Sequence, residues 1–491
     1  MEDRVRRLVG IDLGVTSAHS VCVVRGDGTV LCRRRCESTR ESLEAVEQAA
    51  RAGAEEAVLE VVMEPTGGAW LPVAIFFDSR GHTVYLVSSA QAAAVRRALS
   101  PHAKSNRIDA ETLARMPLMG IRGLRPLVLP DGDRAGLNRM VRACGRLSRQ
   151  LADHKRRLKG LVRQLLPLSP LNGDLGKADL AVLERTGGDP RRLHKMGRAQ
   201  LSKLIARASR NQLGLERAEI WLDSARHSLE LYSQHPAVPY AQLAAEVITE
   251  VQLLMAVETQ LAGFEQGREE AYLRVDDEQL ARSLPGLATV GAPVLMAYMG
   301  DPQRFPRTSH FRSFTGWAPR SSETGDNDRK GQPMSKAGPG QLRTTLYLAA
   351  DHARQEDPQL ARVYYIQMVE RGASHTKALS VVAAKLGDRA LVVMKRGRPY
   401  QLRDTDGRPV TPAEAKAIIA SQWTVPEEVR RRRRSRKQRR KAPQPVLSGK
   451  AKASTYRPTA RRPSSPSILP SHLTPIKDIL QPLMERTDVS T

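Results

Sequence analysis

The segment LVGIDLG, at residues 8–14, decides how the first part of the chain folds. Its apolar run is typical of a buried strand, and it carries one carboxylate, Asp12, two residues before Gly14. A second apolar run follows at 18–24, and the turn GDG at 26–28 leads into a third run at 29–35. This order predicts a strand followed by a hairpin.

Two further strands are predicted at 56–63 and 82–89, and the segments before them, at 40–52 and 69–79, are predicted to be helices. Strands that alternate with helices predict an α/β sheet. Because the hairpin comes first and the alternating units follow, we expect an RNase H-like domain, which we place at 5–130.

Composition excludes several classes of protein. The chain has 491 residues, 78 Lys and Arg against 52 Asp and Glu, and a net charge of +26. It lacks an uninterrupted apolar run of the ~18 residues that a membrane span needs, so we expect no membrane partner. The cysteines form no paired CxxC pattern, which excludes zinc fingers. We expect a cytoplasmic protein associated with the nucleoid.

The strongest concentration of positive charge lies near the C-terminus. Between Arg430 and Arg462 there are 15 basic residues and no acidic one. This segment shows no apolar periodicity and is rich in proline and serine, so we expect a disordered polybasic tail at 425–491. Such a tail binds phosphate backbones without sequence preference, although a solubilising role is the alternative.

The middle of the chain, at 131–275, is predicted to be a helical coiled-coil region. From Leu147 to Leu165, mostly apolar residues recur at alternating steps of four and three positions, which is a heptad seam that Leu137, Val141 and Cys144 extend upstream. The seam comprises Leu137, Val141, Cys144, Leu147, Leu151, His154, Leu158, Leu161 and Leu165. A second long helical stretch is expected at 239–275. The two stretches could form an intramolecular hairpin or an interface between subunits.

Acidic residues end two of the predicted strands. Asp12 ends the first, and Glu64 follows the strand at 56–63. A buried carboxylate is costly unless it binds something, so these side chains are expected to converge at one sheet edge. Asp109, with Asn106 three residues before it, lies near a predicted helix start. Together these oxygens suit Mg²⁺ or Mn²⁺, whereas the alternative is that they are ordinary turn and cap residues.

The block at 280–400 is expected to be a mainly helical domain that contacts DNA. Gly286 and Gly291 fit a hairpin between two helices, whose second helix could hold a phosphate at its N-terminus. A polar loop follows, with hydroxyl groups surrounded by cations, an arrangement that suits attack on a phosphodiester. Its hydroxyl residues are Ser321, Ser322, Thr324 and Ser335, and its cations are Arg320, Arg329, Lys330, Lys336 and Arg343.

Several of these stretches together resemble the DEDD insertion-sequence transposases, the "IS one-ten" group that includes the Piv-type DNA invertases. The matching stretches are GIDLG at 10–14, MEPTG at 63–67, KSNRIDAETLA at 104–114 and the run at 284–350. The resemblance implies a RuvC-like N-terminal domain and a C-terminal domain that carries a hydroxyl nucleophile. It also implies a structured guide RNA, DNA element ends and target DNA as partners, and assembly into homodimers and homotetramers.

Carried over residue by residue, the resemblance assigns Asp12, Glu64 and Asp109 to the first, second and fourth acidic positions. Asn106 occupies the third, where the family expects aspartate, which predicts weaker binding of the metal. The position of the family's nucleophilic serine is occupied by Thr324, and Ser322 is the alternative. Ser335 and Lys336 match a further family motif expected to hold backbone phosphates.

We therefore expect a transposase or site-specific DNA recombinase, dependent on Mg²⁺ or Mn²⁺ and guided by RNA. Two alternatives remain at this point. One is a RuvC-like structure-specific nuclease, which needs the carboxylates but no hydroxyl nucleophile. The other is a catalytically impaired nucleic-acid-binding relative, since Asn106 and Thr324 both depart from the family pattern.

Overall fold

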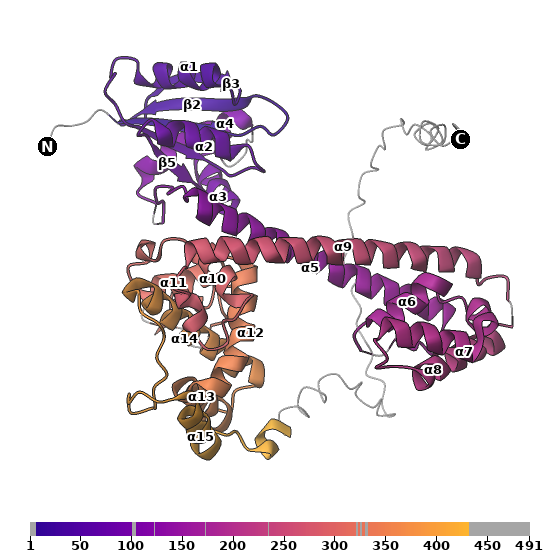
Figure 1. Cartoon of the computed structure of the whole chain (residues 1–491). Coiled ribbons are helices and arrows are strands. Elements are labelled where there is room, and N and C mark those ends of the chain that lie inside the picture. Colours follow the sequence, from indigo (N-terminus) through magenta and orange to yellow (C-terminus); the bar gives the residue numbers. More distant parts are fainter. Residues whose placement is uncertain are drawn as a thin grey trace, which may run out of the picture. The chain divides into compact units, whose positions relative to one another are not determined.

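The computed structural model of the chain is shown in Figure 1. It describes residues 6–100, 105–121, 123–171, 173–233, 235–320, 323–324, 327–328 and 332–431. The predicted tail lies outside the described residues from position 432 onward. Val425, at the start of that predicted segment, is instead buried in the core of the C-terminal part of the chain.

A mixed five-stranded sheet forms the N-terminal part, in the order β3-β2-β1-β4-β5. Its strands are β1 (Arg7–Asp12), β2 (His19–Arg25), β3 (Val30–Cys36), β4 (Leu59–Met63) and β5 (Thr83–Leu86). The first three pair antiparallel, while β4 runs parallel to both β1 and β5. The hairpin and the parallel units that follow it are therefore present as the sequence predicts.

Helices cover both faces of this sheet. They are α1 (Arg40–Arg51), α2 (Trp70–Ser79), α3 (Ser89–Leu99) and α4 (Asn106–Arg115), followed by the short helix η1 (Met116–Met119). Side chains alternate across a strand, so Val9 and Ile11 share a core with α1 and α2, whereas Leu8 packs against α4.

Gly10 allows α4 to lie directly on β1. A Cβ atom at this position would lie 2.0 Å from the carbonyl oxygen of Ala110 and 2.3 Å from the amide nitrogen of Ala114. Both of those atoms belong to the backbone of α4, so no side-chain rotation could relieve the overlap. The glycine of the opening segment is thus required for the close packing of helix on strand.

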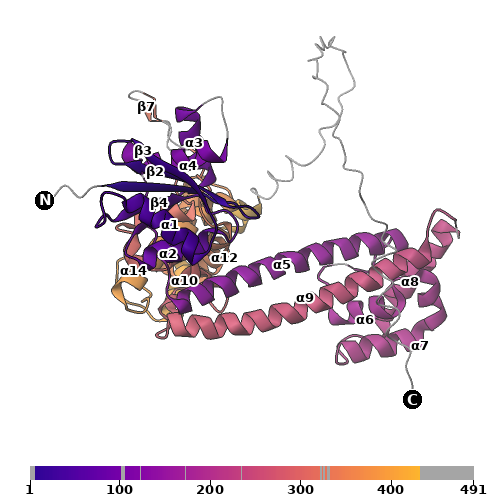
Figure 2. The same ribbon diagram turned by 90° about the horizontal axis from the view of Figure 1, so that it is seen from above.

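The middle of the chain is helical. Its elements are α5 (Gly132–Leu165), α6 (Lys177–Thr186), α7 (Pro190–Ala208), α8 (Leu215–Tyr232) and α9 (Tyr240–Val275). The two long helices, α5 and α9, pack side by side, as Figure 2 shows. Leu137 near the start of α5 shares a core with Tyr272 near the end of α9, so the pair is antiparallel. Of the two alternatives, the structure has the intramolecular hairpin.

The predicted seam of α5 is most deeply buried at its two ends. Leu137, Cys144, Leu158 and Leu165 are buried, whereas Leu151 in the middle is half-buried. Among the described helices, α9 alone is long and apolar enough to cross a membrane by length and composition. It packs on α5 and α6, and 39% of the apolar window is buried.

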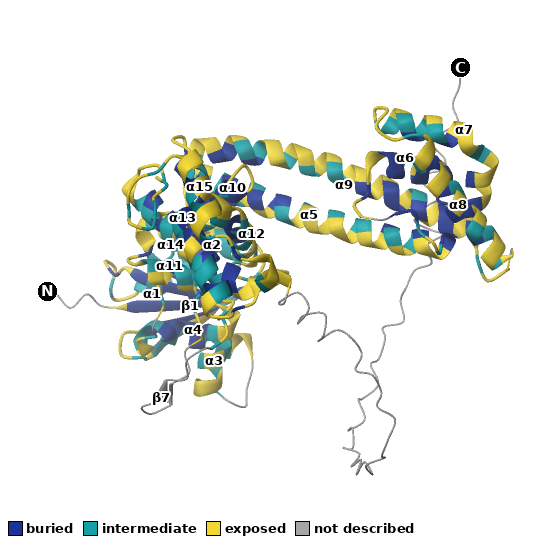
Figure 3. Ribbon diagram, turned by 90° about the horizontal axis from the view of Figure 1, so that it is seen from below, coloured by how far each residue is buried: buried dark blue, intermediate teal, exposed yellow. Residues whose placement is uncertain are grey.

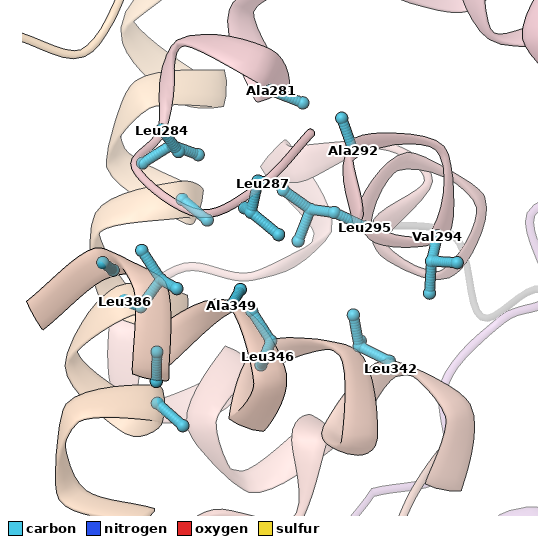
Figure 4. Packing of buried hydrophobic residues seen from close by; sticks show 14 of the residues in the cluster. Ala281, Leu284, Leu287, Ala292, Val294, Leu295, Leu342, Leu346, Ala349 and Leu386 are labelled. Atoms are coloured by element: carbon cyan, nitrogen blue, oxygen red, sulfur yellow. The ribbon is translucent and has the colours of Figure 1, made fainter. Parts of the chain in front are cut away.

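The C-terminal part is mainly helical, as expected. Its elements are η2 (Leu280–Ser283), α10 (Gly291–Met299), η3 (Pro302–Arg304), α11 (Thr308–Thr315), β6 (Glu323–Thr324), β7 (Asn327–Asp328), α12 (Gly340–Glu356), α13 (Pro358–Tyr365), η4 (Ile366–Glu370), α14 (His375–Arg396) and α15 (Pro412–Gln422). Figure 4 shows its core, in which Leu284, Leu287 and Leu295 face Leu346 and Leu386.

We predict that Gly10→Ala destabilises the N-terminal domain, because the new methyl group would push α4 away from β1. Overpacking of this kind typically costs about 1–3 kcal/mol or more. Thermal unfolding followed by fluorescence would show a lower first transition. Gly160→Ala is the matched control, since a Cβ there meets nothing within 4 Å. An unchanged first transition in Gly10→Ala would show that α4 does not need this close approach.

Candidate functional site

The strand register brings Asp12 and Glu64 to the same edge of the sheet. Ile11 on β1 lies opposite Met63 on the parallel strand β4. Asp12 directly follows Ile11, and Glu64 directly follows Met63. Neighbouring strands lie about 4.8 Å apart, so the two carboxylates start from adjacent backbone positions. Both residues are half-buried.

The two carboxylates also belong to the same face of the sheet. Asp12 follows Gly10 by two residues, and Gly10 faces α4. Glu64 follows Val62 by two residues, and Val62 shares a core with Leu113 of α4. The α4 face is therefore the one on which both carboxylates are expected.

Helix α4 runs antiparallel to β1, which brings its first turn to the same edge. Arg115, at the end of the helix, lies close to Gly28 in the turn at the opposite edge. The first turn contains Asn106, which is exposed, and Asp109, which is half-buried. Ser105 caps the helix by accepting a hydrogen bond from the amide of Ile108, at 3.3 Å.

Asp109 has a cationic partner that the sequence did not reveal. The Nε atom of Arg96, in the last turn of α3, lies 3.1 Å from a carboxylate oxygen of Asp109. Within the part of the chain that the structure describes, no three His, Cys, Asp or Glu side chains are placed to hold a metal ion. Carboxylate and amide oxygens are the right donors for Mg²⁺, but Asp109 would have to exchange Arg96 for the ion.

His19 is a second residue that sequence reasoning missed. It is buried, and its Nδ1 atom accepts a hydrogen bond from the amide of Gly14 at 3.1 Å. Its Nε2 atom lies 2.8 Å from the hydroxyl of Ser38. The ring thus fixes the loop that follows Asp12 to the segment that precedes α1. A histidine at the start of an apolar strand was the only available signal, and it is a weak one.

In the C-terminal part, the predicted hydroxyl loop is a hairpin with a firm base. Pro319 pairs with Met334, and the amide of Ser335 donates to the carbonyl of Ala318 at 2.8 Å. Further out, the backbone of Thr324 on β6 pairs with Asn327 on β7. The predicted residues Ser321, Ser322, Arg329 and Lys330 lie outside the described residues.

The base of this hairpin depends on special backbone conformations. Gly316 and Gly338 both have positive φ, and a Cβ at Gly338 would lie 1.8 Å from the carbonyl of Phe314. Lys336 also has a positive φ, of 54°, which is uncommon for a residue with a side chain. The guanidinium of Arg343 donates to the Lys336 carbonyl at 3.0 Å. Arg343 therefore holds the loop, in addition to its predicted contact with DNA.

The remaining residues predicted to contact DNA differ in how far they are exposed to solvent. Arg320 and Lys336 are exposed, and Ser335 is half-buried. Gly286 faces inward, since a Cβ there would lie 2.3 Å from the carbonyl of Ala349 on α12. Gly291 is buried at the start of α10. Packing alone therefore accounts for both glycines, and their role in phosphate binding stays a prediction.

Comparison with known proteins agrees with this architecture. Residues 9–167 match a family model described as a transposase, of the DEDD type, and residues 278–365 match the transposase IS116/IS110/IS902 family. The chain is 27% identical over 407 residues to an uncharacterized 43.6 kDa protein of insertion element IS110 from Streptomyces coelicolor. That alignment covers 80% of this chain and 95% of the relative.

Two further relatives are more distant. The pilin gene-inverting proteins of Moraxella lacunata and Moraxella bovis are each 23% identical over 124 residues, which is 25% of this chain and 38% of theirs. The fold and the matches together define an enzyme of DNA transposition and recombination. The chain belongs to the IS110-type family of DEDD transposases. The resemblance noted in the sequence is thus confirmed.

We predict that the loop after Asp12 weakens in mild acid because of His19. Burial lowers the pKa of this imidazole below its ordinary value of 6.5, since the charged ring would lose its hydration. A lowered pKa means that the neutral form is favoured in the folded state. The stability it contributes is present above pH 6.5 and is lost as the pH falls through the lowered pKa.

The measurement compares the unfolding temperature of the wild type with that of His19→Gln between pH 8 and pH 5. Glutamine can accept from Gly14 and donate to Ser38, but it does not titrate. The wild type should lose more stability on acidification than the variant. Parallel curves for the two proteins would show that His19 does not titrate with folding.

Proposed function

We propose that this transposase cuts and rejoins DNA with a divalent cation held at the sheet edge and a hydroxyl nucleophile in the C-terminal hairpin. The observation that supports this most strongly is the register of β1 and β4, which aligns Asp12 with Glu64 at their carboxyl ends. Two carboxylates that start from adjacent backbone positions at one sheet edge can share a divalent cation. A bound cation gives this arrangement a physical reason.

Asp12, Glu64, Asp109 and Asn106 would hold Mg²⁺ or Mn²⁺. The bound ion would polarise the phosphodiester and stabilise the charge that develops on it. Asn106 supplies an oxygen without a charge, so binding should be weaker than with a fourth carboxylate. Arg96 would leave Asp109 when the ion binds, and it would then be available to the phosphate.

Thr324 is the proposed nucleophile, with Ser322 as the alternative. In the first step the hydroxyl oxygen forms a bond to phosphorus, and the bond between phosphorus and one DNA oxygen breaks. The hydroxyl proton passes to the departing DNA oxygen, directly or through water. Rejoining is the reverse reaction with a different DNA hydroxyl, so no external energy source is needed.

The proposed partners follow from the family. We propose that the enzyme binds the ends of its element and a target DNA, that a structured RNA guides it, and that it acts as a homodimer or homotetramer at the nucleoid. A catalytically impaired relative is the second candidate. It is favoured by Asn106 and Thr324, and by the ion pair that occupies Asp109.

We predict that Asp12→Asn abolishes strand exchange on a supercoiled plasmid while DNA affinity changes by less than about threefold, because the loss concerns only charge at the metal site. Thr324→Ser should preserve or raise activity, and Thr324→Ala should eliminate the covalent adduct seen on a denaturing gel. Full strand exchange by Asp12→Asn would refute metal dependence. A persistent adduct in Thr324→Ala would instead identify Ser322 as the nucleophile.

A separate prediction concerns Asn106. Asn106→Asp restores the fourth charge, so the Mg²⁺ concentration for half-maximal activity should fall by about tenfold, equivalent to ~1.4 kcal/mol. Asn211→Asp, on an exposed turn, is the matched control and should leave the metal dependence unchanged. Equal metal dependence of wild type and Asn106→Asp would place Asn106 outside the metal site.

A further inference from the structure

A row of arginines follows the outer side of α5. Six of them recur at the alternating three- and four-residue steps of the heptad: Arg139, Arg142, Arg146, Arg149, Arg156 and Arg163. We call this row the arginine stripe. All six residues are exposed. The same heptad positions are taken by Asp153 and Gly160, which interrupt the stripe in its second half.

The stripe faces away from α9. Each of its residues comes two or five positions after a seam residue such as Leu137, Cys144, Leu151 or Leu158. At about 100° per residue, a residue two positions after a seam residue lies 200° around the helix axis from it, and a residue five positions after lies 140° around. Both angles are close to 180°, so both positions lie on the side of α5 opposite the seam. Figure 3 shows the resulting alternation of buried and exposed residues along α5. The helix therefore packs on α9 with one side and presents guanidinium groups with the other, where Arg142 also lies over the Tyr298 ring of α10, 5.9 Å from its centroid.

Packing between the two helices does not use the stripe. The ion pairs that join α5 to α9 involve other residues, among them Lys155 with Glu258 at 3.7 Å, Arg157 with Glu250 at 3.3 Å and Asp133 with Arg274 at 2.9 Å. Among the described residues, Arg156 is the one member of the stripe with an acidic partner, Asp153. Helix α9 carries six glutamates, but none of them forms an ion pair with a member of the stripe among the described residues.

We propose that the arginine stripe binds the phosphate backbone of a DNA duplex. At 1.5 Å of rise per residue, the stripe is about 36 Å long from Arg139 to Arg163. A duplex presents one phosphate charge per about 1.7 Å, and bound guanidinium groups release its counterions. Arginine is a common donor to phosphate oxygens, so we assign the stripe to the DNA backbone; base recognition by arginine would require the side chain to enter a groove.

This inference deepens and rests on the proposed function, since a recombinase must hold DNA beyond the bonds that it cuts. It differs from the predicted role of the tail, because the stripe is carried on a folded helix at fixed spacing. Such a surface would orient a duplex, whereas a flexible basic segment would only raise its local concentration. The two contributions are separable by removing arginines from α5 while the tail remains intact.

The test uses the full chain with Arg146, Arg149 and Arg163 changed to glutamine together. Affinity for a random-sequence DNA duplex is measured over a range of salt concentrations, with EDTA present and no divalent cation. The slope of log affinity against log salt should become shallower by about one for each lost contact, so by roughly three in total. Binding without metal also separates this test from the function, because Asp12→Asn should bind as the wild type does.

The matched control removes the same charge from another part of the helical region. It carries Arg192→Gln, Arg198→Gln and Arg226→Gln, at exposed positions of α7 and α8. If both triple variants lose affinity equally, the effect is one of net charge and the proposal is wrong. A second variant with lysine at the three stripe positions should keep the salt slope, which excludes misfolding as the cause of any loss.

A further measurement compares binding of the same variants to an RNA duplex. A stripe variant that loses affinity for DNA supports the proposal, provided that the α7 and α8 control does not. A variant that binds DNA normally but loses affinity for the RNA duplex would overturn the assignment to DNA. Unchanged binding of both nucleic acids would also overturn the proposal and would indicate that the stripe contacts a different acidic surface.

Discussion

The close contact between Gly10 and the backbone of α4 is the constraint on which the N-terminal site depends. Because α4 lies directly on β1 and runs antiparallel to it, its first turn reaches the edge where β1 and β4 end. The strand register supplies Asp12 and Glu64, and the helix supplies Asn106 and Asp109. A bulkier residue at position 10 would move the second pair relative to the first without altering any of the four side chains.

Much of this arrangement could be predicted from local patterns. The opening strand, the hairpin and the parallel units are present, and so is the pairing of two long helices suggested by the heptads at 131–165 and the helical stretch at 239–275. The partners of individual polar groups could not be predicted. Arg96 and Asp109 are separated by a segment with no periodicity, and His19 contacts Gly14 and Ser38 only because the chain turns twice between them.

In the C-terminal part, the partners of polar groups are even harder to predict from the sequence. Asp357 is fully buried, and it caps α13 while its other oxygen accepts from Arg389 of α14 at 2.6 Å and from the Tyr400 hydroxyl. No local pattern joins these three residues. Breaking a buried pair of this kind by removing one partner is typically costly, on the order of 3–5 kcal/mol. The network ties the segment around Tyr400 to α13 and α14.

The heptad repeat of α5 sets both the face that packs on α9 and the row of residues on the opposite, exposed face. A repeat of seven residues keeps the apolar positions facing α9 along the whole helix, and it must therefore also keep the positions two and five residues later facing outward. Any residue type placed at those positions becomes a straight row on the surface. Arginine at six of eight such positions gives the pair one charged side and one packed side, and packing accounts for only one of the six, Arg142, which lies over the Tyr298 ring of α10. The charged side costs self-repulsion among groups that have few acidic neighbours, so its explanation has to come from something that α5 contacts outside the hairpin.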